Sequence, residues 1–295
     1  MKIAIYGHPF EDTSDGFINK MFNILFKKNV DVIIYKAFYD FLAENFSINL
    51  NKAKVFSTCE EITTDLKFII SIGGDGTFLE TVGFVRDKNI PIVGINSGRL
   101  GFLANIAKSE VEKAVNSLIN NNYSVEERAL LELYTNNQLF KDFNYALNDI
   151  TIQKTYSSSM IEAKVLIDDE YLNTYLTDGL IISTPTGSTA YNLSAGGPIV
   201  VPNSNNFIIT PLSPHNLTTR PIVLDDDKEI TITVKGRSKE FMASLDYKSE
   251  TFKDNLVIKI KKANFTIKVI KLEGISFYKT IRDKLMWGAD RRISV

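Results

Sequence analysis

The chain has 295 residues, with 34 lysines and arginines against 35 aspartates and glutamates, so its formal net charge is −1. A chain of this length forms one large domain or two ordinary ones, and we expect two. The balanced charge creates no global field that draws the protein to nucleic acid or to an anionic membrane surface. We therefore expect neither nucleic acid nor a membrane as a partner.

The sequence contains one cysteine, Cys59, and no cluster of Cys and His with metal-ligand spacing. A single cysteine forms no internal disulfide, which fits a reducing compartment. The apolar run before His8 and Pro9 is too short for a signal peptide, and no later run approaches the roughly 18 apolar residues of a membrane span. We expect a cytoplasmic protein in which no residues form a metal site of their own.

Short apolar runs alternate with helical patterns over about the first 120 residues. The runs are nearly continuous, as in strands covered on both faces of a sheet. They occupy 2–7, 30–35, 67–72 and 90–95. Helical spacing of apolar side chains follows at 14–28 and after Thr77. Ser or Thr with Glu three residues later predicts helix starts at Thr58, Thr77 and Ser109. The alternation predicts a doubly wound parallel sheet in an α/β domain over 1–122.

After residue 122 the pattern changes to strands separated by short polar turns. The predicted strands lie at 128–135, 139–147, 150–154, 160–167, 170–176, 206–210, 229–235, 241–245, 255–262 and 265–272. Several alternate apolar and polar residues, as half-exposed antiparallel strands do. We expect a larger, antiparallel β-rich domain over 123–272, and a helical tail over 273–295 that packs back on the first domain.

One acidic residue stands among glycines directly after the strand predicted at 67–72. The run Gly73-Gly74-Asp75-Gly76 lies at the carboxyl end of that strand, where open α/β sheets bind ligands. Glycine lets another molecule approach the bare backbone, and the N–H groups of the turn and of a helix starting at Thr77 attract an anion. A carboxylate here repels phosphate unless it has a separate task, such as accepting a proton from an attacking hydroxyl or holding Mg²⁺. The alternative is that Asp75 merely stabilises a tight turn and caps the helix.

The second half offers groups that suit a nucleotide. In the segment 184–198, Tyr191 suits an adenine ring, and Thr186, Thr189 and Ser194 suit sugar or phosphate oxygens. An ordinary capped helix with Tyr191 in the core is the alternative. Three other polar residues stand at predicted strand ends and suit adenine N–H groups or ribose hydroxyls, although each alone is more often a solvated turn residue. They are Asn148, Asp149 and Asp178.

The run Gly73 to Thr77, GGDGT, resembles the signature shared by NAD kinases and by diacylglycerol and sphingosine kinases, and in the form GGDGS the phosphofructokinases. Further blocks resemble those of NAD kinases in the same order, and they lie at 94–103, 147–149, 178–200, 211–224 and in the R-x-K-L-x-W tail at 282–287. The Thr-Gly-Ser-Thr-Ala-Tyr run within 178–200 is specific, because the lipid kinases and phosphofructokinases lack it. The chain thus resembles the NAD kinase family over most of its length.

This resemblance implies that ATP, with Mg²⁺, phosphorylates the 2′-hydroxyl of the adenosine ribose of NAD, with Asp75 as the catalytic residue. The implied NAD contacts are Asp75, Gly76, Asn148, Asp149, Asp178, Thr186, Thr189, Ala190, Tyr191, Asn192, Leu193 and Ser194. The phosphates of ATP are expected on Gly73, Gly74, Gly76 and Thr77. The resemblance also suggests a homo-oligomer, either a dimer or a tetramer.

Two departures from the family pattern stand out. The family usually has Asn-Glu where this chain has Asn148-Asp149, and it tends to show Asp-Gly-Gln where this chain has SLDYK at 244–248. Lys248 is therefore left outside the predicted site. Two other interpretations remain: a lipid or diacylglycerol kinase-like enzyme that shares GGDGT, and a non-catalytic NAD or NADP sensor that keeps the segment 178–194 without phosphoryl transfer. Neither His8 nor His215 has a spacing that predicts a metal ligand or a catalytic base.

Overall fold

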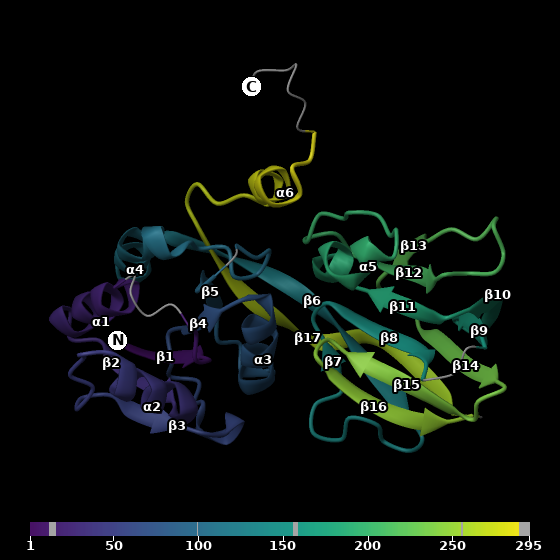
Figure 1. The fold of residues 1–295 in the computed structure, drawn as a ribbon, viewed down its shortest axis with the longest axis horizontal. Coiled ribbons are helices and arrows are strands. Elements are labelled where there is room, and N and C mark those ends of the chain that lie inside the picture. Colours follow the sequence, from purple (N-terminus) through teal and green to yellow (C-terminus); the bar gives the residue numbers. More distant parts are fainter. Residues whose placement is uncertain (12–15, 99, 156–158, 255, 289–295) are drawn as a thin grey trace. The chain divides into compact units, whose positions relative to one another are not determined.

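The structure, a computed structural model, describes residues 1–11, 16–98, 100–155, 159–254 and 256–288. The chain divides into two compact units (Figure 1): the first is Met1–Glu127 together with the chain from Ile267, and the second is Arg128–Thr266. Two long strands, β6 (Tyr123–Thr135) and β17 (Val257–Leu272), each contribute residues to both units. The domain limits expected at 122 and 272 stay predictions.

Parallel strands form the sheet of the first unit, in the order β5-β4-β1-β2-β3. They are β1 (Lys2–Gly7), β2 (Asp31–Tyr35), β3 (Lys54–Phe56), β4 (Ile69–Gly73) and β5 (Ile92–Asn96). Gly7 pairs with Ile72 and Gly73 pairs with Asn96, so the carboxyl ends of β1, β4 and β5 lie together at one edge. The predicted doubly wound parallel sheet is confirmed.

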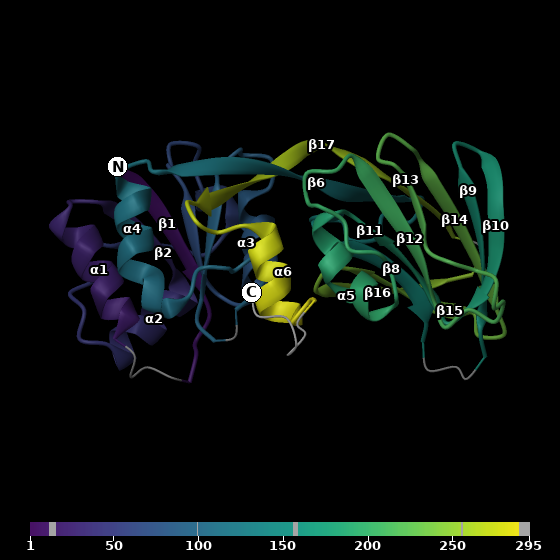
Figure 2. The ribbon, with the colours of Figure 1, turned by 90° about the horizontal axis from the view of Figure 1, so that it is seen from above.

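Helices cover both faces of this sheet. They are α1 (Phe17–Lys27), α2 (Lys36–Asn45), α3 (Asp75–Val85) and α4 (Val111–Ile119). The unit also contains helix α6 (Phe277–Leu285) and the 3-10 turns η1 (Cys59–Glu61) and η2 (Lys108–Glu110). Figure 2 shows α1 and α4 side by side, and Ile3 and Ile5 of β1 belong to the core that these helices cover. Tyr6 of the same strand points to the opposite face, where its hydroxyl donates to Glu80 of α3.

Helix starts in the first unit were predictable only in part. The capping box of Thr58 and Glu61 is confirmed. The start predicted at Thr77 is wrong, because α3 already begins at Asp75, with Gly74 as its N-cap. The start predicted at Ser109 is also wrong, because this residue lies inside the turn η2 and α4 follows it.

The second unit is a sandwich of two antiparallel sheets, with strand orders β13-β12-β11-β8-β15-β16 and β10-β9-β14-β17. Its elements are β7 (Tyr145–Ala146), β8 (Asp149–Lys154), β9 (Ile161–Ile167), β10 (Glu170–Thr177), β11 (Gly179–Ser183), η3 (Thr186–Thr189), α5 (Tyr191–Ser194), β12 (Asn206–Leu212), β13 (Ile222–Asp225), β14 (Ile230–Gly236), β15 (Glu240–Leu245) and β16 (Lys248–Lys253). Ile152 and Phe241 from one sheet share a core with Val165 and Ile232 from the other. The predicted antiparallel β-rich fold is confirmed.

One predicted strand of this unit is largely wrong. Of the segment 139–147, only Tyr145–Ala146 forms a strand. Phe140 and Phe143 are buried, but Phe140 has φ 56°, which no strand residue adopts. The apolar side chains of this segment are buried against the core although the segment is not a strand.

The C-terminal helix α6 belongs to the first unit, as expected. The ring of Phe277 lies 6.4 Å from that of Phe102, centroid to centroid. Helix α6 ends at Leu285. The last residues of the predicted helical tail, from 289 onward, lie outside the described part of the chain.

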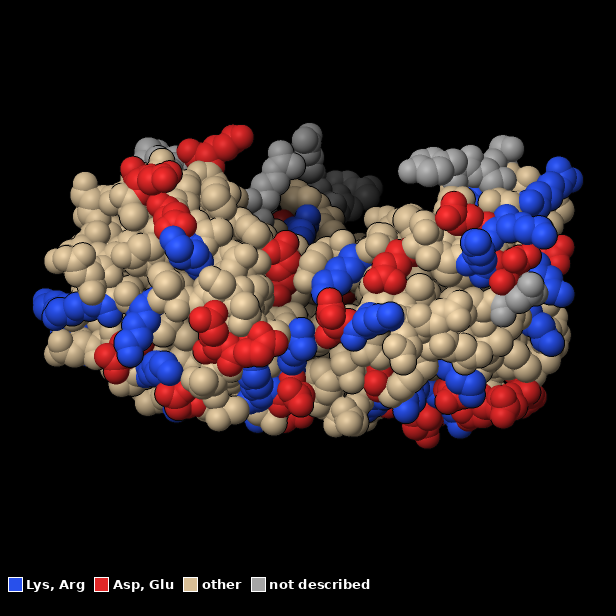
Figure 3. All heavy atoms as spheres, turned by 90° about the horizontal axis from the view of Figure 1, so that it is seen from below, with Lys and Arg blue, Asp and Glu red and all other residues tan. Residues whose placement is uncertain are grey.

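Charged side chains of both signs are interspersed on the face of the molecule in Figure 3. No helix in the described part of the chain is long and apolar enough to cross a membrane. The expectation that the protein binds no nucleic acid stays a prediction.

Candidate active site

The glycine turn of the first unit joins β4 directly to α3. Gly73 ends the strand, Gly74 is the N-cap, and Asp75 is the first helical residue. No side chain of the described residues caps α3. The first N–H groups of a helix have no partner within it, and together with the helix dipole they attract an anion. Because Gly74 and Gly76 are exposed, this turn can receive a phosphate group.

The carboxylate of Asp75 binds the loop that follows β5. Its Oδ2 accepts the N–H of Phe102, and its Oδ1 accepts the N–H groups of Leu103 and Ala104, all at 2.9 Å. The expected alternative that Asp75 caps its own helix is therefore wrong, since its contacts are to residues 27 to 29 positions away, where it stabilises a loop. The loop fixes the direction in which this carboxylate points.

Gly101 permits this contact. A Cβ atom at this position would lie 1.9 Å from Oδ1 of Asp75, far inside van der Waals contact. Gly101 is not among the site residues predicted from the sequence. Gly101 lies in the block 94–103 noted above, but nothing in this block indicates that the Asp75 carboxylate approaches its backbone.

A cation completes the surroundings of Asp75. The Nζ atom of Lys284 on α6 lies 3.6 Å from Oδ2, and the Asp75 side chain is still 30% exposed. The same ammonium group lies 4.5 Å from the centroid of the Phe102 ring. A carboxylate has about four lone-pair positions, and three N–H groups leave one for an additional partner. Lys284 is likewise absent from the predicted site residues, although it stands in the R-x-K-L-x-W tail.

A second polar cluster lies at the end of β1. The hydroxyl of Tyr6 donates to Oε2 of Glu80 at 2.6 Å, and Nε2 of His8 contacts the same oxygen. The His8 side chain is 44% exposed. Sequence reasoning treated His8 as an ordinary loop residue, whereas the structure gives it an acidic partner from α3.

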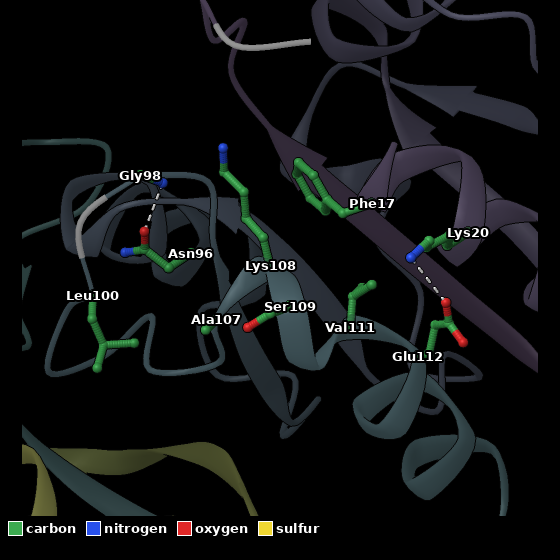
Figure 4. Close-up of a pocket in the computed structure, with 10 residues that line it drawn as sticks. All are labelled: Phe17, Lys20, Asn96, Gly98, Leu100, Ala107, Lys108, Ser109, Val111 and Glu112. Carbon is green, nitrogen blue, oxygen red and sulfur yellow. Dashed lines mark hydrogen bonds and ion pairs between the residues drawn. The ribbon is translucent and has the colours of Figure 1, made fainter. Parts of the chain in front are cut away.

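A pocket of about 510 Å³ lies in the first unit (Figure 4), and Asn96, which lines it, pairs with Gly73 of the glycine turn. Described residues that line it are Phe17, Lys20, Asn96, Gly98, Leu100, Ala107, Lys108, Ser109, Val111 and Glu112. Lys20 pairs with Glu112 at 3.3 Å, and Oδ1 of Asn96 accepts the N–H of Gly98 at 2.7 Å. None of these lining residues is a predicted site residue.

In the second unit, the segment from Leu147 to Asp149 is held on both sides of its backbone. Oδ2 of Asp246 accepts the N–H of Leu147 at 2.8 Å, and Oδ1 accepts those of Asn148 and Asp149 at 2.9 and 3.1 Å. On the carbonyl side, the Thr184 hydroxyl donates to Leu147 O at 2.6 Å, and the Thr184 N–H donates to Asn148 O at 2.9 Å. The backbone of this segment is therefore rigidly placed.

The two polar side chains of this segment are almost entirely buried, with 9% of Asn148 and 7% of Asp149 exposed. Asn148 has no side-chain hydrogen bond within the described part of the protein, whereas Asp149 accepts one from the Thr151 hydroxyl at 3.1 Å. Burial raises the pKa of Asp149 to about 7, and the nearby Asp246 carboxylate raises it as well. A buried amide and a buried acid with unused bonding capacity indicate a place for a polar ligand.

The same enclosure acts on Asp246 itself. The residue as a whole is half-buried because it stands in a turn, but its carboxylate points into the protein. Burial raises the pKa of Asp246 to about 6, even though the three N–H bonds to its oxygens act in the opposite direction. Asp246 lies in the segment 244–248 noted above but is not among the predicted site residues, because the sequence does not show which N–H groups it binds.

The segment from Thr186 to Ser194 forms the turn η3 and the short helix α5. Tyr191 is 46% exposed, so the alternative that places it in the core is wrong. Ser194 is exposed, Thr189, Ala190 and Leu193 are half-buried, and Thr186 is buried.

Asn192 differs from these neighbours because it is fully buried. Its Nδ2 donates to Ser188 O and Pro198 O, both at 3.2 Å, and its Oδ1 accepts the Thr210 hydroxyl at 2.6 Å. These bonds hold the segment in shape. The implied contact of Asn192 with NAD stays a prediction.

The two polar segments of this unit touch at Gly187. A Cβ atom here would lie 2.1 Å from the carbonyl oxygen of Asn148. Asp178 stands at the end of β10 and forms an ion pair with Lys154 at 2.6 Å. Lys248 lies 5.4 Å from the ring centroid of Phe143 and 5.6 Å from that of Tyr247, so its charge faces aromatic rings.

Family models match both halves of the chain. The model of the ATP-NAD kinase N-terminal domain matches residues 3–123, and the model of the ATP-NAD kinase C-terminal domain matches residues 147–272. An NAD kinase of Flavobacterium johnsoniae is 42% identical over 294 residues, which cover 99% of this chain and 100% of that protein.

Solved structures share the fold. The yeast NADH kinase complexed with NADH aligns with a TM-score of 0.88 at 23% identity, covering 100% of this chain and 90% of that one. An NAD kinase from Archaeoglobus fulgidus in complex with ATP aligns with a TM-score of 0.74 at 24% identity, covering 97% and 98%. Because both domain models match and a full-length relative is 42% identical, the chain belongs to the ATP-NAD kinase family.

Proposed function

We propose that the chain transfers a phosphoryl group from ATP to the 2′-hydroxyl of the adenosine ribose of NAD, giving NADP. Family membership supports the activity. The observation that carries the chemistry is the Asp75 carboxylate, which three N–H groups fix in direction while 30% of its side chain stays exposed.

Asp75 accepts or orients the proton of the attacking hydroxyl in this proposal. Phosphoryl transfer requires little covalent chemistry from the protein, and positioning with charge neutralisation provides most of the catalysis. A carboxylate clamped by a loop loses little freedom when substrate binds, which favours this role. Lys284, 3.6 Å from Oδ2, reduces the repulsion between Asp75 and an incoming phosphate.

The phosphates of ATP bind at Gly73, Gly74, Gly76 and Thr77 in this proposal. The uncapped start of α3 supports it, because N–H groups at a helix start bind anions. Within the described residues, no three His, Cys, Asp or Glu side chains gather as metal ligands. Mg²⁺ carried on the phosphates of ATP would neutralise part of their charge at this turn.

The second unit holds the adenosine part of NAD in this proposal. Asn148 and Asp149 offer a buried amide and acid for adenine N–H or ribose hydroxyl groups, and the exposed Tyr191 ring offers a stacking surface. Asp178, Thr186, Thr189, Ala190, Leu193 and Ser194 are further proposed contacts. Homo-oligomer formation and a cytoplasmic location remain predictions.

Two other functions have less support. The lipid kinase interpretation rests on GGDGT alone, whereas the NAD kinase C-terminal model also matches residues 147–272. A non-catalytic sensor would bind NAD without turnover. The intact glycine turn and its clamped acid favour an enzyme over a sensor.

The test is calorimetric titration of the purified protein with NAD, followed by an assay of NADP formation with Mg²⁺ and ATP, other nucleoside triphosphates or polyphosphate. We expect both NAD binding and NADP formation. Binding without NADP from any donor would establish the sensor. A protein that neither binds NAD nor forms NADP would overturn the assignment of both units.

A further inference from the structure

We propose that Asp246 is a positioning residue for the NAD-binding segment, acting through the backbone of Leu147–Asp149 rather than on the ligand. This inference rests on the proposed function, because it assigns the purpose of the segment to NAD. Asp246 stands in the segment 244–248, where the family tends to show Asp-Gly-Gln, but the sequence alone gives no partner or role for it. The case for it comes from its turn, its hydrogen bonds and its backbone conformation.

The turn that carries Asp246 is built for a special residue. Leu245 of β15 pairs with Lys248 of β16, so only Asp246 and Tyr247 connect the two strands. Asp246 has φ 51°, in the left-handed region that disfavours most side chains and that Asp and Asn tolerate better than others. Its own N–H donates to Asp149 O at 3.1 Å, which ties the turn to the start of β8.

The three N–H groups that Asp246 accepts come from consecutive residues. Successive N–H groups that converge on one point form a nest, a concave site that attracts an anion. If no anion filled it, these donors would be buried and unpaired, at a cost of about 1–3 kcal/mol for each. The Asp246 carboxylate fills this site permanently, 97 to 99 residues away from it in the sequence.

Filling the nest fixes the two side chains beside it. The peptide planes on either side of Asn148 are held by Asp246 through their N–H groups, and Asn148 O is held by the Thr184 N–H and the Ser183 hydroxyl. With both sides of the backbone restrained, the side chains of Asn148 and Asp149 leave the chain in fixed directions. The carboxylate oxygens of Asp246 face the loop, so its effect reaches a ligand only through these neighbours.

Asp246→Asn is the direct test. Asn keeps the volume and tolerates the left-handed backbone, but its NH₂ group cannot accept an N–H bond. We expect the NAD dissociation constant, measured by calorimetry, to rise about 10–100-fold, the effect of losing one or two charge-assisted hydrogen bonds. The ATP dissociation constant should stay within about twofold, and turnover at saturating NAD within about threefold, because the glycine turn is untouched.

Asp246→Gly separates the carboxylate from the backbone strain. Glycine adopts φ 51° freely, so this variant relaxes the turn while it empties the nest. We expect NAD binding to weaken at least as much as in Asp246→Asn. Restored NAD affinity in the glycine variant would mean that the turn, and not the carboxylate, sets the site.

Asp168→Asn is a matched control. Asp168 also has a left-handed backbone, with φ 49°, and its Oδ1 accepts the N–H of Glu229 at 2.9 Å. It holds a different loop of the same unit. NAD affinity should stay within about twofold of the unmodified protein in this variant, since the Leu147–Asp149 segment keeps its nest.

Backbone hydrogen exchange provides a readout that needs no ligand. Amides of Leu147, Asn148 and Asp149 should exchange faster in Asp246→Asn than in Asp168→Asn. Faster exchange with unchanged NAD affinity would overturn the positioning role, as would equal loss of NAD and ATP binding with a lower melting temperature. The unmodified protein could also bind no NAD while the exchange rates of these amides still depended on Asp246. That result would overturn the proposed function but leave the contact between Asp246 and the segment in place.

Discussion

The two units contain the same hydrogen-bonding arrangement with different surroundings. In each, one aspartate accepts three consecutive backbone N–H groups: the first goes to Oδ2 and the next two to Oδ1. Asp75 keeps 30% of its side chain exposed and has Lys284 beside it. The carboxylate of Asp246 is enclosed and has another acid, Asp149, as its neighbour.

This difference shows that the contact alone does not define a role. A clamped carboxylate with an open face can still meet a substrate, so Asp75 suits a reacting group. A clamped carboxylate that is enclosed serves the loop it holds. Variants of the two aspartates should therefore separate turnover from NAD affinity.

The largest effect is expected for Asp75→Asn. Turnover should fall by about 10²–10⁴, because an amide cannot accept the proton, while NAD affinity stays within about tenfold. Steady-state NADP formation and calorimetry measure the two quantities. The pattern is the reverse of that expected for Asp246→Asn, and unchanged turnover would reject the assigned role of Asp75.

Glycine-to-alanine substitutions sharpen the comparison. In Gly101→Ala the new Cβ would lie 1.9 Å from Asp75 Oδ1, so the carboxylate or its loop must shift, and turnover should fall about 10–100-fold. In Gly187→Ala the new Cβ atom would lie 2.1 Å from Asn148 O, so NAD affinity, rather than turnover, should fall. Each substitution should also lower the free energy of unfolding by about 1–3 kcal/mol, measured in urea. If both variants lost the same property, the proposed division of roles would be wrong.

The buried acids of the second unit predict a pH dependence of stability. The pKa of Asp149 is about 7 in the folded protein and near its ordinary value of about 4 when unfolded. Between these values the folded state holds the proton and the unfolded state has released it, so the free energy of unfolding falls as pH rises from about 4 to about 7. Asp149→Asn should flatten this slope and stabilise the protein at pH 8 by on the order of 1–3 kcal/mol. Urea unfolding at several pH values measures the free energy of unfolding of both proteins. A slope that is unchanged in Asp149→Asn would contradict the raised pKa of Asp149.

The smallest effect is expected for Lys284→Ala. Lys284 and Asp75 are each about one-third exposed, so their pair should contribute less than about 1 kcal/mol to stability, and turnover should fall less than about tenfold. Both effects should shrink in high salt. Lys279→Ala, at an exposed position of the same helix, is the control. A loss as large as that of Asp75→Asn would make Lys284 a central catalytic group rather than a charge neighbour.

The sequence predicts those parts of the fold that depend on local pattern. Continuous apolar runs indicated the buried parallel strands, and alternation indicated the antiparallel sheets. The N-cap of α3 was misplaced by three residues, because the Thr77–Glu80 spacing imitates a capping box, whereas Gly74 is the N-cap. Strand β16 was not predicted, since most of Lys248–Lys253 is exposed and polar and shows no alternation.

The residues of the candidate site also fall into two groups, those that a local sequence motif identifies and those that it does not. Asp75 and the segment around Asn148 stand in recognisable motifs, so the sequence identified them. Asp246 depends on N–H groups 97 to 99 residues away, and Gly101 on the carboxylate of a residue on another element. Such contacts exist only after the chain has folded, so no local pattern reports them.

The first unit is discontinuous, because the chain from Ile267 returns to it after the whole second unit. A ribosome releases residues 1–127 early, but the end of β17 and helix α6 emerge last. Domains generally fold during synthesis once their residues are available. We therefore expect the edge of β5 that pairs with β17 to stay uncovered, and Asp75 to lack Lys284, until the second unit has been translated. The loop of residues 102–104 can therefore bind Asp75 before the second unit is made, whereas Lys284 can reach it only afterwards.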